Sequence, residues 1–158
     1  MAALKAAPVA VALSLTASLA SPMFGGPATA RPGHDDVTRI DACLAGAGNL
    51  SSACIGIVAD ACLKMADSTE RMGDCEARER AVWEAWLKRD SIAAKARLKP
   101  PASTRFAEIQ AAFEADTARR CDFVAVLNGP TTLNRPASEE CALHAAAEQW
   151  LWLRSVLP

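Results

Sequence analysis

The sequence predicts an all-α fold: a small, disulfide-stapled antiparallel bundle of about three to five helices. Apolar residues recur at three- and four-residue steps over several segments, which is the spacing of one helix face. No segment shows the strict alternation of a half-buried β-strand. Six cysteines, an even number, follow an N-terminal export signal, and this combination is typical of a disulfide-linked secreted domain.

The first thirty residues have the features of a secretory signal peptide. A positive charge precedes residues 6–20, a run of fifteen residues without a charge. The run is shorter than the roughly 20 residues that a spanning helix needs, which favours cleavage over an uncleaved anchor helix. Cleavage after Ala30 fits the A-x-A pattern, and Ala20 marks a second candidate. We expect residues 1–30 to be removed and residues 31–158 to form a single domain, periplasmic or secreted, with no stable membrane anchor.

The charge balance of the mature chain excludes two classes of partner. Removal of the leader would leave 128 residues with 16 basic and 18 acidic side chains, a net charge of −2 with both histidines neutral. Such a chain has no strongly basic surface for nucleic acid and no polybasic patch for an anionic membrane. Its length suits one modest core.

The spacing of the six cysteines favours disulfides over a metal site or a redox site. They are Cys43, Cys54, Cys62, Cys75, Cys121 and Cys141. No two of them form the C-x-x-C pair that zinc sites and thiol oxidoreductases commonly carry. The two histidines, His34 and His144, are far from any such pair. We expect three disulfides, no metal ion and no other cofactor.

Helix geometry restricts the fifteen possible pairings of these cysteines. If residues 52–64 are helical, Cys54 and Cys62 lie about 12 Å apart at 1.5 Å per residue, beyond the roughly 7 Å limit for a bridge. Pairs that span a turn between two helices are therefore favoured. These pairs are Cys43 with Cys54, Cys62 with Cys75, and Cys121 with Cys141.

Two short helices are expected before the long ones. The first covers residues 37–45 and ends at a Gly-Ala-Gly-Asn break. Ser51 or Ser52 can cap the second, which runs through Leu63.

A long helix is then expected over residues 70–98. Asp67 and Glu70 resemble a capping box at its start, and two prolines end it. Trp83 and Trp86 lie on its apolar side, whereas charge pairs with i,i+4 spacing lie on another side.

Two further helices complete the bundle. Ser103 can cap a helix over residues 104–127. The apolar positions of this helix are Phe106, Ile109, Phe113, Val124 and Leu127. Residues 128–138 form the longest polar loop, and Ser138 can cap the last helix.

Three side chains carry expectations about burial. Gln110 lies within an apolar stripe, so we expect an interhelical hydrogen bond, because a buried amide needs partners. Trp150 and Trp152 are two positions apart and point to different sides of a helix, so one should be buried and the other at least partly exposed.

No catalytic motif stands out. Ser91 is followed by Lys95 at +4, whereas a Ser-x-x-Lys acylation motif needs +3. His144 has no accompanying nucleophile, so packing at the edge of the core is the favoured role. Carboxylate pairs such as Glu139 and Glu140 are typical of solvated helix charges. We predict that the protein is not an enzyme, and a small hydrolase is the least favoured reading.

Residues 68–87 and 106–121 resemble the lysozyme inhibitor LprI-like N-terminal domain family, small exported bacterial proteins that are helical and contain cysteines. The matching positions are Thr69, Met72, Cys75, Trp83, Leu87, Gln110, Phe113, Cys121, Gly129, Thr131 and Cys141. The chain departs from the family pattern at Lys88, Ser91 and Thr117, where Asn, Tyr and Arg are common. The resemblance spans roughly residues 40–157.

This resemblance implies a non-enzymatic protein-binding domain, with a lysozyme-type muramidase as the partner. A bond between Cys121 and Cys141 would hold the loop at residues 128–138 near both ends, and such rigidity lowers the ordering cost of binding. Asn134 and Arg135 would lie at the tip of this loop and contact the partner. The alternative is an envelope structural or interaction protein that binds an unrelated protein.

Overall fold

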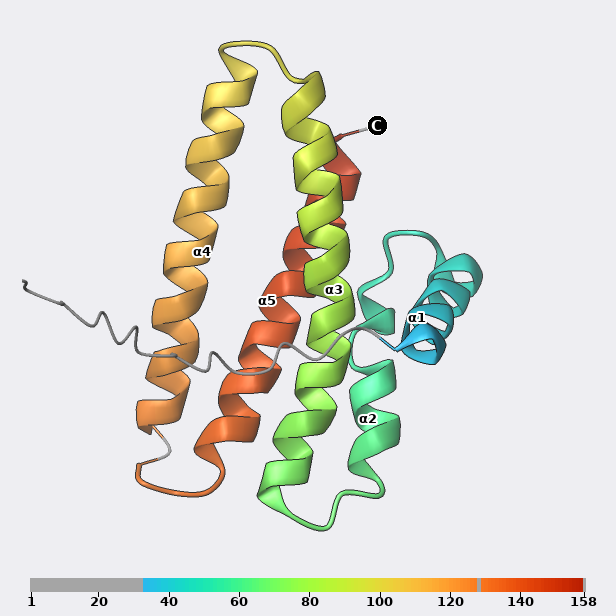
Figure 1. The fold of residues 1–158 in the computed structure, drawn as a ribbon, viewed down its shortest axis with the longest axis vertical. Helices are drawn as coiled ribbons and strands as arrows, with labels where there is room; N and C mark the ends of the chain where they lie inside the picture. Colours follow the sequence, from blue (N-terminus) through green and yellow to red (C-terminus); the bar gives the residue numbers. More distant parts are fainter. Residues whose placement is uncertain (1–32, 128, 158) are drawn as a thin grey trace, which may run out of the picture.

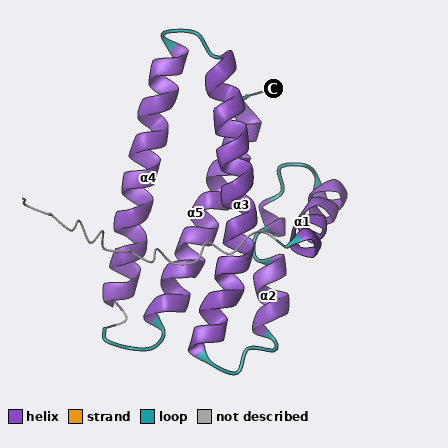
Figure 2. Cartoon of the chain, viewed as in Figure 1, coloured by secondary structure: helices purple, strands orange, loops and turns teal. Residues whose placement is uncertain are grey.

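The computed structural model describes residues 33–127 and 129–157, and within these ranges it confirms the all-α fold, with five α-helices and no strand (Figures 1 and 2). The predicted signal peptide, residues 1–30, lies outside the described residues. The elements in order are α1 (His34–Ala47), the 3-10 helix η1 (Ser52–Cys54), α2 (Ile57–Leu63), α3 (Thr69–Arg97), α4 (Ala102–Leu127) and α5 (Asn134–Val156).

Helix α3 is at the centre of the arrangement. Helices α1 and α2 lie on one side of it, and α5 packs along it as its most extensive partner (Figure 1). Helix α4 runs antiparallel to α3 and α5, packs against α5 and makes little contact with α3. The layout is therefore a tightly paired α3–α5 core with α1 and α2 on one side and α4 on the other.

Three tryptophans form the centre of the main core. The ring centroids of Trp83, Trp86 and Trp150 are 5.2–5.5 Å apart, in edge-on and tilted arrangements that aromatic rings favour. Trp150 is buried whereas Trp152 is 37% exposed, as their spacing predicted. The apolar side chains around the tryptophans come from α1, η1, α2, α3 and α5, so α4 contributes nothing to this cluster.

A buried carboxylate connects α2 to α3. Glu79 of α3 is fully buried and accepts hydrogen bonds from the backbone N–H groups of Gly56 (2.7 Å), Val58 (2.7 Å) and Ala59 (2.9 Å). It also accepts one from Nε1 of Trp83 at 3.0 Å. The first N–H groups of a helix have no partner within that helix, and the N-cap Gly56 has no side chain that could supply one. Glu79 therefore caps α2 from a neighbouring helix.

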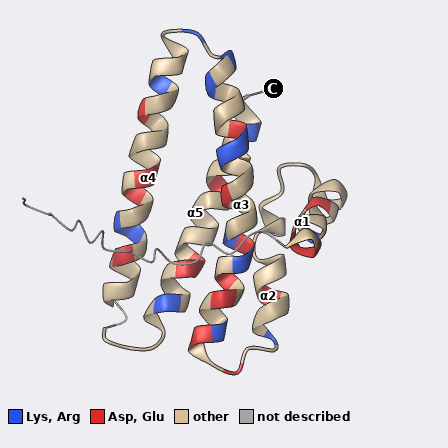
Figure 3. Cartoon of the chain, in the orientation of Figure 1, with Lys and Arg blue, Asp and Glu red and all other residues tan. Residues whose placement is uncertain are grey.

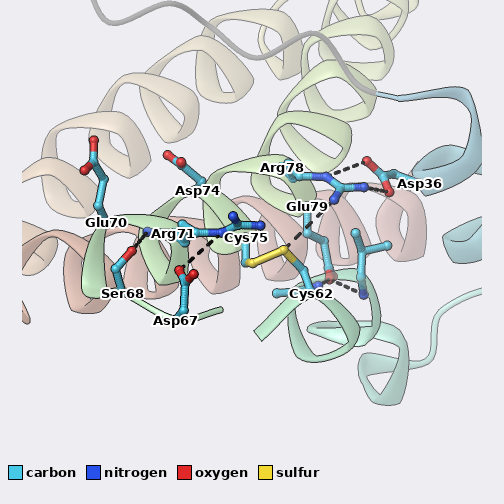
Figure 4. Close-up of a disulfide and its surroundings, with 12 residues drawn as sticks. Asp36, Cys62, Asp67, Ser68, Glu70, Arg71, Asp74, Cys75, Arg78 and Glu79 are labelled. Atoms are coloured by element: carbon cyan, nitrogen blue, oxygen red, sulfur yellow. Dashed lines mark hydrogen bonds and ion pairs between the residues drawn. A yellow bond between two sulfur atoms is a disulfide. The ribbon is translucent and has the colours of Figure 1, made fainter. Parts of the chain in front are cut away.

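Three disulfides fasten the helices, and they join the same three pairs that helix geometry favoured. Cys43–Cys54 links α1 to η1, Cys62–Cys75 links α2 to α3 (Figure 4), and Cys121–Cys141 links α4 to α5. The Cα–Cα distances of 5.8, 5.5 and 5.4 Å lie within the usual range for such bonds. Every helix is held to another by one covalent bond. These bonds indicate an oxidising, extracytoplasmic environment.

The second short helix differs from its expected form. Instead of one helix from residue 52 to Leu63, the chain forms η1 and α2, separated at Gly56. Gly56 has φ of +94°, a left-handed conformation that glycine adopts without steric cost and other residues rarely adopt. The break lets the N-terminus of α2 turn toward Glu79 of α3.

The predicted caps of the long helices are also wrong. Ser68, and not Asp67, caps α3, because its hydroxyl accepts a hydrogen bond from the backbone N–H of Arg71 at 3.3 Å. Ser103 lies inside the first turn of α4, and Ser138 lies inside α5.

Helix α4 buries little of its apolar stripe. Among its residues only Phe106 and Cys121 are buried, whereas Ile109 is 43% and Leu127 is 67% exposed. Phe106 packs in a small second cluster with Ala94 of α3 and Leu153 of α5. The stripe is exposed because α4 rests on α5 alone over most of its length. Among the described helices, none is both long enough and apolar enough to cross a bilayer.

Replacing Glu79 tests whether the carboxylate holds α2 in place. We expect Glu79→Gln to lower the free energy of unfolding by about 3 kcal/mol, because the new amide faces buried N–H donors with donors of its own. Urea unfolding of the oxidised protein measures the change. Glu148→Gln is the matched control, since Glu148 is exposed on α5 and should shift stability by less than about 0.5 kcal/mol. Equal unfolding midpoints for the two variants would contradict the proposed cap.

Candidate functional site

The predicted binding loop is shorter than expected, and its two expected contact residues lie in a helix. Helix α5 begins at Asn134, so Asn134 and Arg135 belong to its first turn. The side-chain amide of Asn134 donates to the backbone oxygen of Gly129 at 2.6 Å. Pro136 explains the early start, because proline fits the first turn of a helix and need not mark a loop.

Arg135 is engaged by α3 and does not lie at a loop tip. Its guanidinium forms an ion pair with Asp74 and donates to the backbone oxygen of Glu70 at 2.7 Å. A Cβ atom at Gly73 would lie 3.1 Å from Arg135 Cγ, so this glycine permits the close approach of the arginine side chain. Arg135 therefore fixes the start of α5 against the start of α3.

The positions of the family motif separate into two regions. Thr69 and Met72 lie in the first turn of α3. Leu87, Gln110 and Phe113 come together around a groove between α3 and α4. Trp83, as described above, lies in the core.

A groove lies between α3 and α4. Its volume is about 820 Å³, and α5 forms its floor. Its apolar lining includes Leu87, Ile92, Phe106, Ala111, Phe113 and Ala146. It exists because α4 packs against α5 and makes little contact with α3 (Figure 1). The small cluster around Phe106 and the Cys121–Cys141 bond hold α4 near its two ends. We refer to it as the α3–α4 groove.

Three residues of the α3–α4 groove carry buried polar atoms without a hydrogen-bond partner among the described residues. These atoms are Ser91 Oγ, Gln110 Nε2 and Thr117 Oγ1. The prediction that the side-chain amide of Gln110 forms an interhelical hydrogen bond is therefore wrong for the amide nitrogen. An unpaired buried polar atom costs free energy, so a bound group that pairs with these three atoms would remove that cost.

The charges along the α3–α4 groove are unevenly paired. Acidic and basic side chains are interspersed along α3 and α4 (Figure 3). Glu84 forms an ion pair with Arg80 at 2.6 Å. Lys88 and Lys95, which also line the groove, form no ion pair among the described residues. The α3 wall therefore carries two ammonium groups that have no protein counter-ion within the described part of the chain.

Apolar side chains project into solvent at the C-terminal end of α4. Phe123 is 58%, Val126 67% and Leu127 67% exposed. Residues at i, i+3 and i+4 share one side of a helix, so the three form one apolar surface. We call these three residues the α4 end patch. The Cys121–Cys141 bond holds this end of α4 against α5.

The electrostatics of the α3–α5 interface centre on Glu76. Burial, and then the neighbouring carboxylates Glu140, Glu79, Asp60 and Glu139, raise the pKa of Glu76 from 4.5 to about 7. Both burial and like charge disfavour the ionised form. Glu76 therefore changes charge near neutral pH.

The acid–base candidates from the sequence, His144, Glu139 and Glu140, all lie on α5. His144 is exposed on α5, so its expected packing at the edge of the core is wrong. Glu139 forms an ion pair with Arg80 at 2.8 Å, which links α5 to α3. In residues 33–127 and 129–157, no group of three His, Cys, Asp or Glu side chains could hold a metal ion.

The sequence analysis did not predict the roles of Glu79, Ser91 and Thr117, although the sequence contains a signal for Glu79. Glu79 lies four positions after Cys75 and four before Trp83, and all three are buried. A carboxylate in the middle of an apolar stripe indicates a buried polar partner, because an unpaired buried charge is too costly. Thr117 gave a similar signal, since it lies four positions after Phe113 and four before Cys121. Ser91 gave none, since its position is also typical of a solvated helix face.

Comparison with known proteins identifies no relative of this chain. No family model matches the chain, and neither a curated protein nor a solved structure matches it. Its function has to be inferred from its own residues and their geometry.

The raised pKa of Glu76 predicts a pH-dependent stability that Glu76→Gln removes. Between pH 4.5 and about 7 the folded chain keeps a proton on Glu76 that the unfolded chain has lost. Stability from this group is therefore present below pH 4.5 and is lost as pH rises through about 7. Urea unfolding across this range should show Glu76→Gln gaining stability relative to the wild type as pH rises.

Glu148→Gln is again the control, because it should show no such relative gain. A difference between wild type and Glu76→Gln that stays constant from pH 4.5 to about 7 would contradict the assigned pKa.

Proposed function

We propose that the protein is a non-enzymatic binding protein of the bacterial envelope, exported by its N-terminal signal to the periplasm or the medium, and that it binds a protein partner through the α4 end patch. The single observation that carries this proposal is the exposure of Phe123, Val126 and Leu127 on a helix that is covalently fixed to its neighbour. Contiguous exposed apolar side chains commonly mark protein interaction sites.

The rigidity of the patch supports this role. Cys121 lies two residues before Phe123 and is bonded to Cys141 of α5. A surface that is already ordered loses little conformational entropy on binding, so more of the contact energy appears as affinity. A large aromatic side chain flanked by aliphatic ones is also a common anchor at interfaces.

The proposed partner is a lysozyme-type muramidase. The resemblance of residues 68–87 and 106–121 to the LprI-like family supports this choice. The mature chain would carry a net charge of −2, which suits a cationic enzyme. The α4 end patch takes the place of Asn134 and Arg135 as the contact surface, because those two side chains are engaged within the protein.

A turbidity assay of cell-wall lysis tests both the partner and the surface. Micromolar oxidised protein should slow lysis by lysozyme, and Val126→Glu should weaken inhibition on the order of tenfold, because it buries a charge in an apolar contact. Met65→Glu is the matched control, since Met65 is 76% exposed and lies far along the chain from the patch. Circular dichroism verifies that both variants are folded.

Unchanged lysis at micromolar protein would reject a muramidase as the partner. Equal inhibition by Val126→Glu and the wild type would reject the patch as the contact surface. Failure of the lysis assay, followed by capture of a different envelope protein that Val126→Glu no longer binds, would favour the alternative role as an envelope interaction protein.

A further inference from the structure

We propose that the α3–α4 groove binds an anionic single-chain lipid, one with a long apolar chain, a polar linkage and a negatively charged head. This site is separate from the α4 end patch, since none of Phe123, Val126 and Leu127 lines the groove. The inference therefore goes beyond the proposed protein-binding function and does not depend on it.

The size and lining of the groove suit a ligand of this class. Its volume of about 820 Å³ falls within the roughly 300–1,000 Å³ that small-molecule sites usually have. Leu87, Ile92, Phe106 and Phe113 provide an apolar surface along its walls. An extended acyl chain can lie between two long antiparallel helices and remove this surface from water, at about 0.8 kcal/mol for each buried CH₂ group.

The unpaired polar atoms favour a lipid over a docking helix. Ser91 Oγ, Gln110 Nε2 and Thr117 Oγ1 are buried and without a partner among the described residues. An amphipathic helix would offer an apolar face and keep its backbone groups bonded internally, so these atoms would stay unpaired. The ester and hydroxyl oxygens of a lipid linkage can accept from and donate to them.

The charge of the groove selects a negative head group. Lys88 and Lys95 are seven positions apart on α3, so they lie about 10 Å apart along the same side of the helix. Neither has an ion-pair partner among the described residues, and the charge of Glu84 is neutralised by Arg80. Glu114 on the α4 wall is the remaining carboxylate in the lining. The α3 wall therefore offers a phosphate or carboxylate two cationic contacts.

Calorimetric titration with three single-chain lipids below their micelle concentrations tests the proposal. Oleoyl lysophosphatidylglycerol carries an acyl chain, an ester and an anionic phosphate, and it should bind the oxidised protein with one-to-one stoichiometry. Lysophosphatidylcholine with the same chain has a zwitterionic head and should bind on the order of tenfold more weakly, because the positive choline offsets the phosphate. Oleate has an anionic head group but no polar linkage, so its affinity should lie between those of the two lysolipids.

Two variants locate the site, each with a matched control. Ala111→Trp fills the groove and should abolish lysophosphatidylglycerol binding, whereas Ala112→Trp, one position along the exposed surface of α4, should leave it unchanged. The double variant Lys88→Glu/Lys95→Glu should weaken binding at least about tenfold. Lys64→Glu/Lys99→Glu makes the same change in net charge outside the groove and should have less than about a twofold effect.

Three results would overturn the proposal. They are the absence of saturable binding of lysophosphatidylglycerol, equal affinity for the anionic and zwitterionic lipids, and unchanged binding by Ala111→Trp that is shown to be folded by its thermal transition. Saturable binding of a helical peptide in place of all three lipids would assign the groove to a protein partner instead. Lysozyme inhibition is not measured in this experiment, so its outcome leaves the role of the α4 end patch to the lysis assay.

Discussion

The buried carboxylate of Glu79 is the interaction on which the organisation of the N-terminal half depends. It bonds three backbone N–H groups at the start of α2 and the indole N–H of Trp83, so it joins a helix terminus to the centre of the core. With α2 held in this way, Cys62 lies within bonding distance of Cys75 on α3. An ion pair between Arg78 and the buried Asp36 then fixes α1 on the same face of α3 (Figure 4).

The other half of the molecule is organised differently, because α4 packs along α5 and makes little contact with α3. Phe106 fixes one end in the small cluster with Ala94 and Leu153, and the bond from Cys121 fixes the other. The α3–α4 groove and the α4 end patch are both consequences of this attachment, and both functional proposals concern α4.

Periodic apolar spacing predicted the helical fold, because this feature follows from local repeats. The cysteine pairs also agreed with the sequence argument, since a bridge across a short helix-to-helix turn is restricted by chain length. Boundaries were less predictable. Pro136 suggests a loop when it is considered alone, but it also fits the first turn of a helix, and this ambiguity placed Asn134 and Arg135 in the wrong environment.

The sequence by itself determined which segments are helical, which side chains can form a core and that six sulfurs can be paired in an oxidising compartment. Only the tertiary structure decided that Glu79 is buried as a cap, that Arg135 is occupied by α3, and that Ser91, Gln110 and Thr117 surround a hollow. The physical reason is that periodicity gives the faces of a single helix, whereas partners for polar groups depend on how far apart two helices lie. That separation is set by contacts between residues distant in sequence, at both ends of α4.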